Sequence, residues 1–298
     1  MDSGLTAARR PEMTSVEGGS GASGAAEVGF AVRDGTTRLV HLYQHNPMRV
    51  LFPATEAGDA RLAVLLTTSG GLVAGDRIRV AVCLAAGAVA QVTAAAAEKI
   101  YRSTGATTEI AQDLAVDSRG WLEYLPPETI LFDGARLRRH TNIALMPDAG
   151  FLGGGILVFG RRARGEAFSR GLVHDEWQMT RDGMLQWGDA LHLDDVSGDL
   201  AAIMADPACF DAAAACATLV LAPPEGDPSG FIDSARALQQ HSTSPGLRAG
   251  VTAVGGLLLA RWLGPDAQAL RRAVADLACH LRAAAMGLPA HLPRLWYA

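Results

Sequence analysis

The amino-acid sequence predicts a mainly β protein, built as a stacked or helical antiparallel β-sheet with a few helices and an α/β portion toward the C-terminus. Three observations support this fold class. Apolar and polar residues alternate with a period of two through much of the region from residue 30 to residue 198. Short turns that end in glycine separate consecutive alternating runs. After about residue 206, the alternation gives way to apolar residues at helical spacing.

The first predicted pair of strands is the run 78–84, with apolar residues at every second position, and the run 88–94. The turn 85–87, which ends in glycine, separates them. Two strands joined by a tight turn usually form a hairpin, so each such pair predicts antiparallel neighbours. The pattern recurs in the pair 110–116 and 121–125, in the pair 143–146 and the run from 151, and between Trp177 and Trp187 across 181–183. Since no fixed period relates these units, the sequence does not predict a true solenoid repeat.

The C-terminal part predicts two helices and a strand. The segment 231–241 is a short predicted helix, and the apolar run 253–263 is a predicted strand. The segment 265–286 is the clearest helix, with Pro265 suited to its first turn and Gly287 to its end. Its apolar face consists of Leu270, Val274, Leu277 and Leu281.

The domain boundaries follow from composition. Residues 1–28 are rich in Gly, Ser, Ala and Thr without an apolar period, which predicts a disordered tail. Residues 29–298 are expected to form a single β-rich domain, whose α/β portion covers about 206–298.

Charge and motif content exclude several classes of protein. The 298-residue chain has a net charge of −5, so it lacks the basic surplus of a nucleic-acid binder. None of its four cysteines forms a Cys-x-x-Cys pair, which argues against a zinc knuckle or a thioredoxin-type site. A P-loop, a His-Glu-x-x-His helix and a Gly-x-Ser-x-Gly elbow are absent from the sequence. Without a secretion signal or an apolar run of membrane-spanning length, the expected compartment is the cytoplasm.

Three charged segments stand beside strongly apolar strands. They are 98–103, which holds the only lysine, 125–137 and 158–166. Buried charges must be paired, because an unpaired one costs several kcal/mol. One interpretation is a set of ion pairs that close the strand ends, for instance Arg161 or Arg162 with Glu128. The other is a polar surface that docks a partner protein, and the residues alone leave both open.

Histidines and carboxylates provide the candidate metal ligands. His41 and His45 are four residues apart and can share a face, so a metal pair is conceivable, although surface histidines at a strand end are the simpler interpretation. The remaining relevant histidines are isolated in the sequence and are interpreted in the same way: His140, His174 and His192. The pair Asp175-Glu176 is interpreted as a solvated turn or edge unless geometry brings other ligands to it.

The order of several motifs resembles the UreD family of urease accessory proteins, called UreH in some organisms. The resemblance begins with the glycine-rich run 70–76, continues through the charged segments described above, and covers roughly residues 28–298. Ala74 departs from the family pattern, in which glycine is frequent. The motif residues expected to serve structure or partner binding are Gly70, Gly71, Gly75, Glu98, Lys99, Tyr101, Arg102, Arg136, Gly160, Arg161, Arg162 and Gly165.

The resemblance implies a non-catalytic scaffold that acts with UreF and the GTPase UreG to deliver nickel into apo-urease. It implies a β-rich stacked fold, no tightly bound cofactor, and transient contact with Ni²⁺ along a polar channel. Besides the histidine pair, the candidate nickel ligands are Asp76, Glu128, Asp133, Glu166 and Glu176. Two alternatives are an undescribed enzyme that uses the polar strand ends, and a purely structural β protein.

Overall fold

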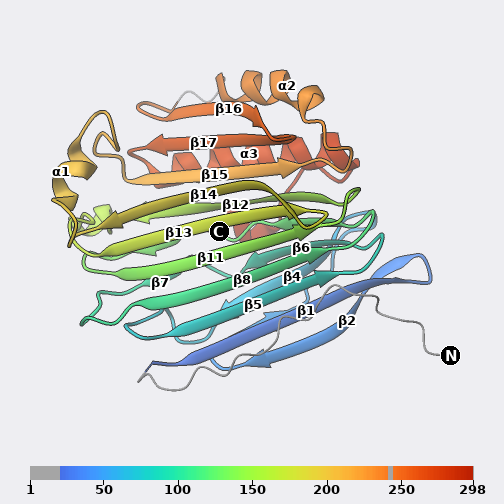
Figure 1. Cartoon of the computed structure of the whole chain (residues 1–298), viewed down its shortest axis with the longest axis horizontal. Helices are drawn as coiled ribbons and strands as arrows, with labels where there is room; N and C mark the ends of the chain where they lie inside the picture. Colours follow the sequence, from blue (N-terminus) through green and yellow to red (C-terminus); the bar gives the residue numbers. More distant parts are fainter. Residues whose placement is uncertain (1–20, 241–243, 298) are drawn as a thin grey trace.

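The computed structural model describes residues 21–240 and 244–297, which form two large β-sheets and three α-helices. Figure 1 shows the strands stacked one above another, from β2 at the bottom to β17 and β16 at the top. A mainly β, stacked architecture with a few helices is therefore confirmed.

The strands form two sheets, called sheet A and sheet B, and the helices lie outside them. Sheet A has seven strands in the spatial order β14 (Met184–Asp194), β13 (Leu172–Arg181), β11 (Arg136–Leu145), β8 (Thr108–Val116), β5 (Arg77–Leu84), β1 (Ser23–Arg33) and β2 (Thr36–His45). Sheet B has the order β16 (Arg248–Val254), β17 (Leu257–Gly264), β15 (Ala215–Ala222), β12 (Gly150–Phe159), β9 (Trp121–Tyr124), β6 (Val89–Ala94), β4 (Arg61–Thr67) and β3 (Met48–Leu51). Sheet B also includes β10 (Thr129–Leu131), which pairs with β12 and with β7 (Glu98–Ile100). The helices are α1 (Leu200–Ala205), α2 (Ser229–Gln240) and α3 (Ala267–Met286), and short 3₁₀ turns cover Arg162–Arg164 and Arg294–Tyr297.

Most strands pair in parallel, so the predicted antiparallel hairpins are wrong in the middle of the chain. Strands β5, β8, β11 and β13 are parallel neighbours in sheet A, and β4, β6, β9 and β12 are parallel neighbours in sheet B. Two strands joined by a short turn, such as β5 and β6, lie in opposite sheets. Each coil of the chain therefore adds one strand to each sheet, as in a β-solenoid.

The turns explain why sequence patterning misjudged the pairing. In the turn after β5, the Ala85 amide donates to the Phe30 carbonyl and the Gly87 amide donates to the Ser118 carbonyl. These partners belong to neighbouring coils, so the ladder runs along the stack. Period-two alternation and a glycine turn occur both in hairpins and in coils that cross between sheets, and they do not distinguish the two.

True hairpins occur toward the ends of the stack. The predicted hairpin between Trp177 and Trp187 is confirmed as the antiparallel pair β13–β14. The predicted strand 253–263 is instead two strands, because Gly255 and Gly256 adopt positive φ angles of 56° and 80° and turn the chain from β16 into β17.

Strand β1 corrects the predicted disordered tail. The strand begins at Ser23 and pairs in parallel with β5, so the segment from Ser23 to Val28 is ordered. Its side chains Ala26, Val28 and Phe30 alternate into the core and are buried. The small residues between them obscured this alternation in the sequence. Residues 1–20 of the predicted tail lie outside the described residues.

The core fills the space between the two sheets. It contains the inward-facing side chains of both sheets, among them Val80, Leu114, Ile143 and Phe151, all nearly or fully inaccessible to solvent. Burial of each large apolar side chain contributes about 1.5–3 kcal/mol, so this interior supplies most of the stabilisation.

Helix α3 covers the outer face of sheet B and builds a second core cluster. Leu270, Leu277 and Leu281 are buried there together with apolar side chains of β15 and β17. The predicted helix is confirmed, but Pro265 lies before the N-cap and not in the first turn. Asp266 is the N-cap, and its Oδ1 accepts hydrogen bonds from the Gln268 and Ala269 amides. As predicted, Gly287 ends the helix, with a left-handed φ of 64°.

The helix predicted at 231–241 is confirmed as α2, apart from its last residue, which lies outside the described residues. None of the helices formed by the described residues has the length and apolar character needed to cross a bilayer.

Candidate functional site

The outer face of sheet A carries a row of histidines. Period-two alternation in β11 and β13 turns Arg139 and Asp175 inward, and it turns their neighbours His140, His174 and Glu176 outward. The parallel register places His140 beside Glu176, since these two residues are paired across β11 and β13. His192 on β14 is paired with His174 and extends the row.

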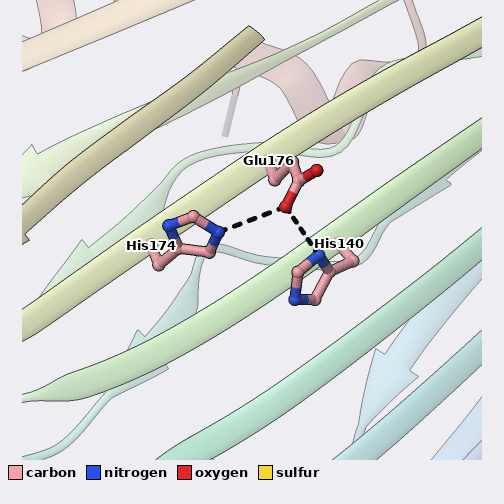
Figure 2. A group of neighbouring side chains, drawn as sticks. All are labelled: His140, His174 and Glu176. Carbon is pink, nitrogen blue, oxygen red and sulfur yellow. Dashed lines mark hydrogen bonds and ion pairs between the residues drawn. The ribbon is translucent and has the colours of Figure 1, made fainter. Parts of the chain in front are cut away.

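Two imidazoles converge on one carboxylate oxygen. Glu176 Oε2 lies 3.1 Å from His140 Nδ1 and 3.2 Å from His174 Nε2. Figure 2 shows both rings pointing at this oxygen from neighbouring strands. One ligand atom from each of the three residues lies within 4.8 Å of the others. The side chains of His174 and Glu176 are 21% and 27% exposed, so the cluster is accessible to a solvated ion.

Neighbouring groups hold the carboxylate and one imidazole in place. Gln178 Nε2 donates to Glu176 Oε1 at 2.9 Å, which leaves the other oxygen directed at the histidines. His174 Nδ1 lies 3.3 Å from His192 Nδ1. The hydrogen bonds from His174 and Gln178 lower the pKa of Glu176 below its ordinary value, so the carboxylate is ionised at neutral pH.

Two imidazole nitrogens and a carboxylate are a donor set for a divalent cation of the first transition row. Imidazole suits Ni²⁺, Zn²⁺ and Cu²⁺, whereas Mg²⁺ and Ca²⁺ prefer sites made of oxygen alone. His140 and His174, which are isolated in the sequence, remain surface histidines in the structure, but strand pairing brings both of them to Glu176. The pattern His174-x-Glu176 on a strand was a signal that both side chains share one face, but the third member depends on strand pairing that the sequence does not show.

The inner face of the same two strands carries a buried ion pair. Arg139 Nε donates to Asp175 Oδ1 at 2.8 Å, and Arg139 Nη1 donates to Thr129 Oγ1 at 2.9 Å. Gly155 on β12 faces this guanidinium, because a Cβ there would lie 3.5 Å from Arg139 Nη2. Nearby, burial raises the pKa of Cys216 to about 12, so its thiol is protonated at neutral pH.

Three candidate metal ligands have structural roles elsewhere. Asp76 is buried and accepts hydrogen bonds from the amides of Ala22 and Val73, which holds the glycine-rich loop against the start of β1. His41 pairs with Glu27 at 3.0 Å, and His45 Nδ1 contacts the Ser23 carbonyl at 2.9 Å. The two histidines engage different partners, so the structure does not bring them together as a pair.

Glu128 also lies apart from the histidine cluster. Its carboxylate pairs with Arg271 of α3 at 3.3 Å. The predicted pairing of Glu128 with Arg161 or Arg162 is wrong, since Arg161 pairs with Glu166 at 2.5 Å and Arg162 donates to the Ala212 carbonyl. The sequence could not show that α3 returns to this strand end.

Asp133 and Glu166 form a joint network at the end of β10 and β12. Asp133 accepts hydrogen bonds from the Ser169 amide and hydroxyl, both at 2.9 Å, and from Arg170 Nη2 at 2.9 Å. Burial acts to raise the pKa of Asp133, but these hydrogen bonds outweigh it and hold the pKa below its ordinary value. The pairing with Arg161 lowers the pKa of Glu166 in the same way. Both carboxylates are thus engaged by arginines and amides.

The motif residues of the first charged segment pack against the glycine-rich loop. Leu72 N donates to the Lys99 carbonyl at 2.7 Å, and the Tyr101 hydroxyl donates to the Gly70 carbonyl at 3.2 Å. Gly71 is required there, because a Cβ would lie 2.6 Å from Tyr101 Cε2. Glu98 accepts a hydrogen bond from Thr67, and burial raises the pKa of its carboxyl.

The remaining motif residues make turns or ion pairs. Arg102 lies 3.5 Å from Asp133, and Arg136 pairs with Asp195 at 3.0 Å. Gly75, Gly160 and Gly165 adopt positive φ angles of 85°, 83° and 72°. Ion pairs therefore close several strand ends, as one interpretation of the charged segments proposed, whereas partner docking stays a prediction.

A second buried network was not predicted from the sequence. Arg282 of α3 is fully buried and pairs with Glu123 at 3.0 Å and with Asp59 at 2.5 Å. Its Nη1 also donates to the carbonyls of Pro289 and His291. Burial raises the pKa of Glu123, and the neighbouring Arg282 opposes that effect. The network ties the C-terminal segment to sheet B. Arg282 and Glu123 are 159 positions apart in the sequence.

The fold and the site together define a solenoid-like, two-sheet β protein in which two histidines and a glutamate converge on the outer face of one sheet. Comparison with known proteins then identifies the family. The family described as UreD urease accessory protein matches residues 22–297. The chain belongs to this family, as the resemblance of its motifs indicated.

Individual relatives support the assignment. The urease accessory protein UreD of Magnetococcus marinus is 40% identical over 278 residues, which cover 93% of this chain and 94% of the relative. That of Methylobacterium sp. (strain 4-46) is 43% identical, with 89% of this chain and 90% of the relative covered. That of Azorhizobium caulinodans is 40% identical, with 92% and 96% covered.

Proposed function

We propose that this chain is a urease maturation factor, a non-catalytic scaffold that helps deliver nickel into apo-urease. One observation carries the proposal: the family match extends over residues 22–297, and the similar proteins are named urease accessory proteins. The similarity covers 93% of this chain and 94% of the relative from Magnetococcus marinus, so it is not confined to a shared module.

The proposed partners are UreF, the GTPase UreG and the apo-urease subunits, and the proposed compartment is the cytoplasm. A P-loop is absent from this sequence, which fits a complex in which another subunit binds GTP. Nickel is the cargo and not a resident cofactor. The buried Arg139–Asp175 pair and the paired strand ends favour a rigid scaffold, since their charges are already satisfied within the chain.

The N-terminal end of the stack supports a docking role. Strand β2 is the edge of sheet A and β3 is the edge of sheet B. Near these edges Val40, Leu42 and Leu51 are 49%, 42% and 50% exposed. An open strand edge with exposed apolar side chains favours association with another chain.

Co-purification tests this proposal. Full-length chain co-expressed with UreF is expected to elute with it as a complex, and addition of apo-urease is expected to shift that complex to larger size. The substitution Val40→Lys is expected to weaken the complex. Leu185→Lys is the matched control, because Leu185 is 67% exposed in the distant β13–β14 hairpin. Failure of the unmodified chain to elute with UreF or apo-urease would contradict the proposal.

A further inference from the structure

The histidine cluster on the outer face of sheet A is separate from the motif segments on which the family resemblance rests. His140, His174 and Glu176 lie in the middle of β11 and β13, away from the turns and strand ends. The outer face of a sheet needs no histidines for stability. Their convergence therefore calls for a chemical explanation.

Two ring nitrogens face the same carboxylate oxygen, which is an arrangement that one cation can bridge. His140 Nδ1 and His174 Nε2 both lie within 3.2 Å of Glu176 Oε2. Each of these nitrogens can donate an N–H to that oxygen from a neutral ring, or can offer its lone pair to a metal ion beside the oxygen. One divalent ion would satisfy all three ligand atoms.

The spacing of the ligand atoms matches a metal site. A first-row ion bonds to imidazole nitrogen or carboxylate oxygen at about 2.0–2.2 Å, so adjacent ligands lie about 3 Å apart. The two distances from Glu176 Oε2 are 3.1 Å and 3.2 Å. Small rotations of the imidazole rings would then direct both nitrogens at an ion placed beside this oxygen.

The surrounding residues supply the outer contacts of such a site. When His174 binds through Nε2, its Nδ1–H can donate to His192 Nδ1, 3.3 Å away. Gln178 holds the second oxygen of Glu176. Contacts of this kind fix the orientation of metal ligands in proteins. His140 is paired with Ala111 of β8, and Glu176 is paired with Ala190 of β14. The small side chains of these two alanines leave the site open.

We propose that His140, His174 and Glu176 form a surface binding site for a divalent first-row transition cation, with His192 as the outer partner of His174. That the ion is Ni²⁺ in the cell rests on the proposed function. The site lies on the solvent-facing side of sheet A, where an incoming ion would be accepted before transfer. Its remaining coordination positions would hold water or a ligand from a donor protein.

Direct titration of the full-length chain with NiCl₂ at pH 7.5 tests the site. Wild-type protein is expected to bind one Ni²⁺ at this site, and His174→Ala or the double variant with His140→Ala is expected to bind it at least about tenfold more weakly. His41→Ala is the matched control, because His41 also contacts a glutamate, at 3.0 Å, on the same sheet. That control is expected to bind as the wild type does.

A spectroscopic measurement covers the case in which a variant fails to fold. Cu²⁺ bound to the wild-type chain is expected to show electron paramagnetic resonance couplings from two imidazole nitrogens. A spectrum with oxygen ligands alone, or equal nickel affinity of wild type and a folded double variant, would overturn the site. That result would leave the maturation role intact, because co-purification tests it independently. The opposite combination is also informative. If the variants lost nickel binding but the wild-type chain formed no complex with UreF or apo-urease, the metal site would stand and the proposed function would be contradicted.

Discussion

Arg139 and Asp175 form a buried ion pair directly behind His140 and Glu176, the next residues on the same two strands. The inner face of β11 and β13 thus carries a paired charge, and the outer face carries the proposed metal ligands. The backbone ladder of β11 with β13 sets the spacing between the ligands, and the ion pair adds a side-chain link between the same two strands.

Removal of one partner of this pair is expected to destabilise the fold strongly. Asp175→Ala leaves the Arg139 guanidinium buried and unpaired, which should lower the free energy of unfolding by about 3–5 kcal/mol. Urea unfolding monitored by tryptophan fluorescence measures the change. The double variant Arg139→Met/Asp175→Leu should recover most of it, because neither charge remains.

A surface pair in the same sheet provides the control. Arg77 and Glu109 lie 3.3 Å apart, with side chains 36% and 54% exposed, so Glu109→Ala should cost no more than about 1 kcal/mol. Equal losses for Asp175→Ala and Glu109→Ala would show that burial of the inner pair carries no extra energy.

Arg138 is expected to weaken cation binding at the proposed site. It is exposed on β11 and paired in register with His174, so its positive charge lies close to the ligands. Arg138→Ala should therefore raise nickel affinity a few-fold at low salt, with the gain reduced at about 1 M salt by screening. Titration calorimetry at two salt concentrations measures this. An unchanged affinity at low salt would place the bound ion elsewhere.

The Asp133 network predicts a pH-dependent contribution to stability. The folded-state pKa of Asp133 lies below the ordinary value of 3.8, so its ionised form stabilises the fold at all pH values above that range. This contribution is lost as the pH falls through the folded-state pKa. Asp133→Asn should therefore be less stable than wild type between pH 5 and pH 7, and the difference should shrink below about pH 3.8. Urea midpoints across this range test the sign, and a gap that widened on acidification would refute it.

The glycine-rich loop predicts different costs at two neighbouring positions. Gly71→Ala places a Cβ 2.6 Å from Tyr101 Cε2 and 2.9 Å from the Lys99 carbonyl oxygen, whereas a Cβ at Gly70 meets no atom within 4 Å. Both glycines have positive φ, so both substitutions carry a backbone cost of about 1 kcal/mol, and Gly71→Ala adds the steric cost. Thermal unfolding should rank Gly71→Ala well below Gly70→Ala. Equal midpoints would mean that the loop shifts freely.

Sequence patterns predicted the elements better than their pairing. The runs 78–84 and 88–94 coincide closely with β5 and β6, because alternation reports which face is buried. The sheet to which each run belongs depends on hydrogen bonds between coils, such as Ala85 to Phe30, which have no local signature. The parallel stack was therefore misread as a series of hairpins.

The candidate site was only partly accessible from sequence. Glu176 was among the predicted ligands, but its partners lie on two strands, and His140 is 36 residues away from it in the chain. Only the register of β11 with β13 joins them. The buried pair of Arg282 with Glu123 was hidden for the same reason, since its members are 159 positions apart.

The nickel content of urease tests the central proposal most directly. Urease would be purified from cells grown at limiting nickel, with and without this chain, and its nickel measured by mass spectrometry. A maturation factor predicts urease that is largely free of nickel when the chain is missing, with recovery when the wild-type chain is restored. Fully nickel-loaded urease in cells without the chain would contradict that role.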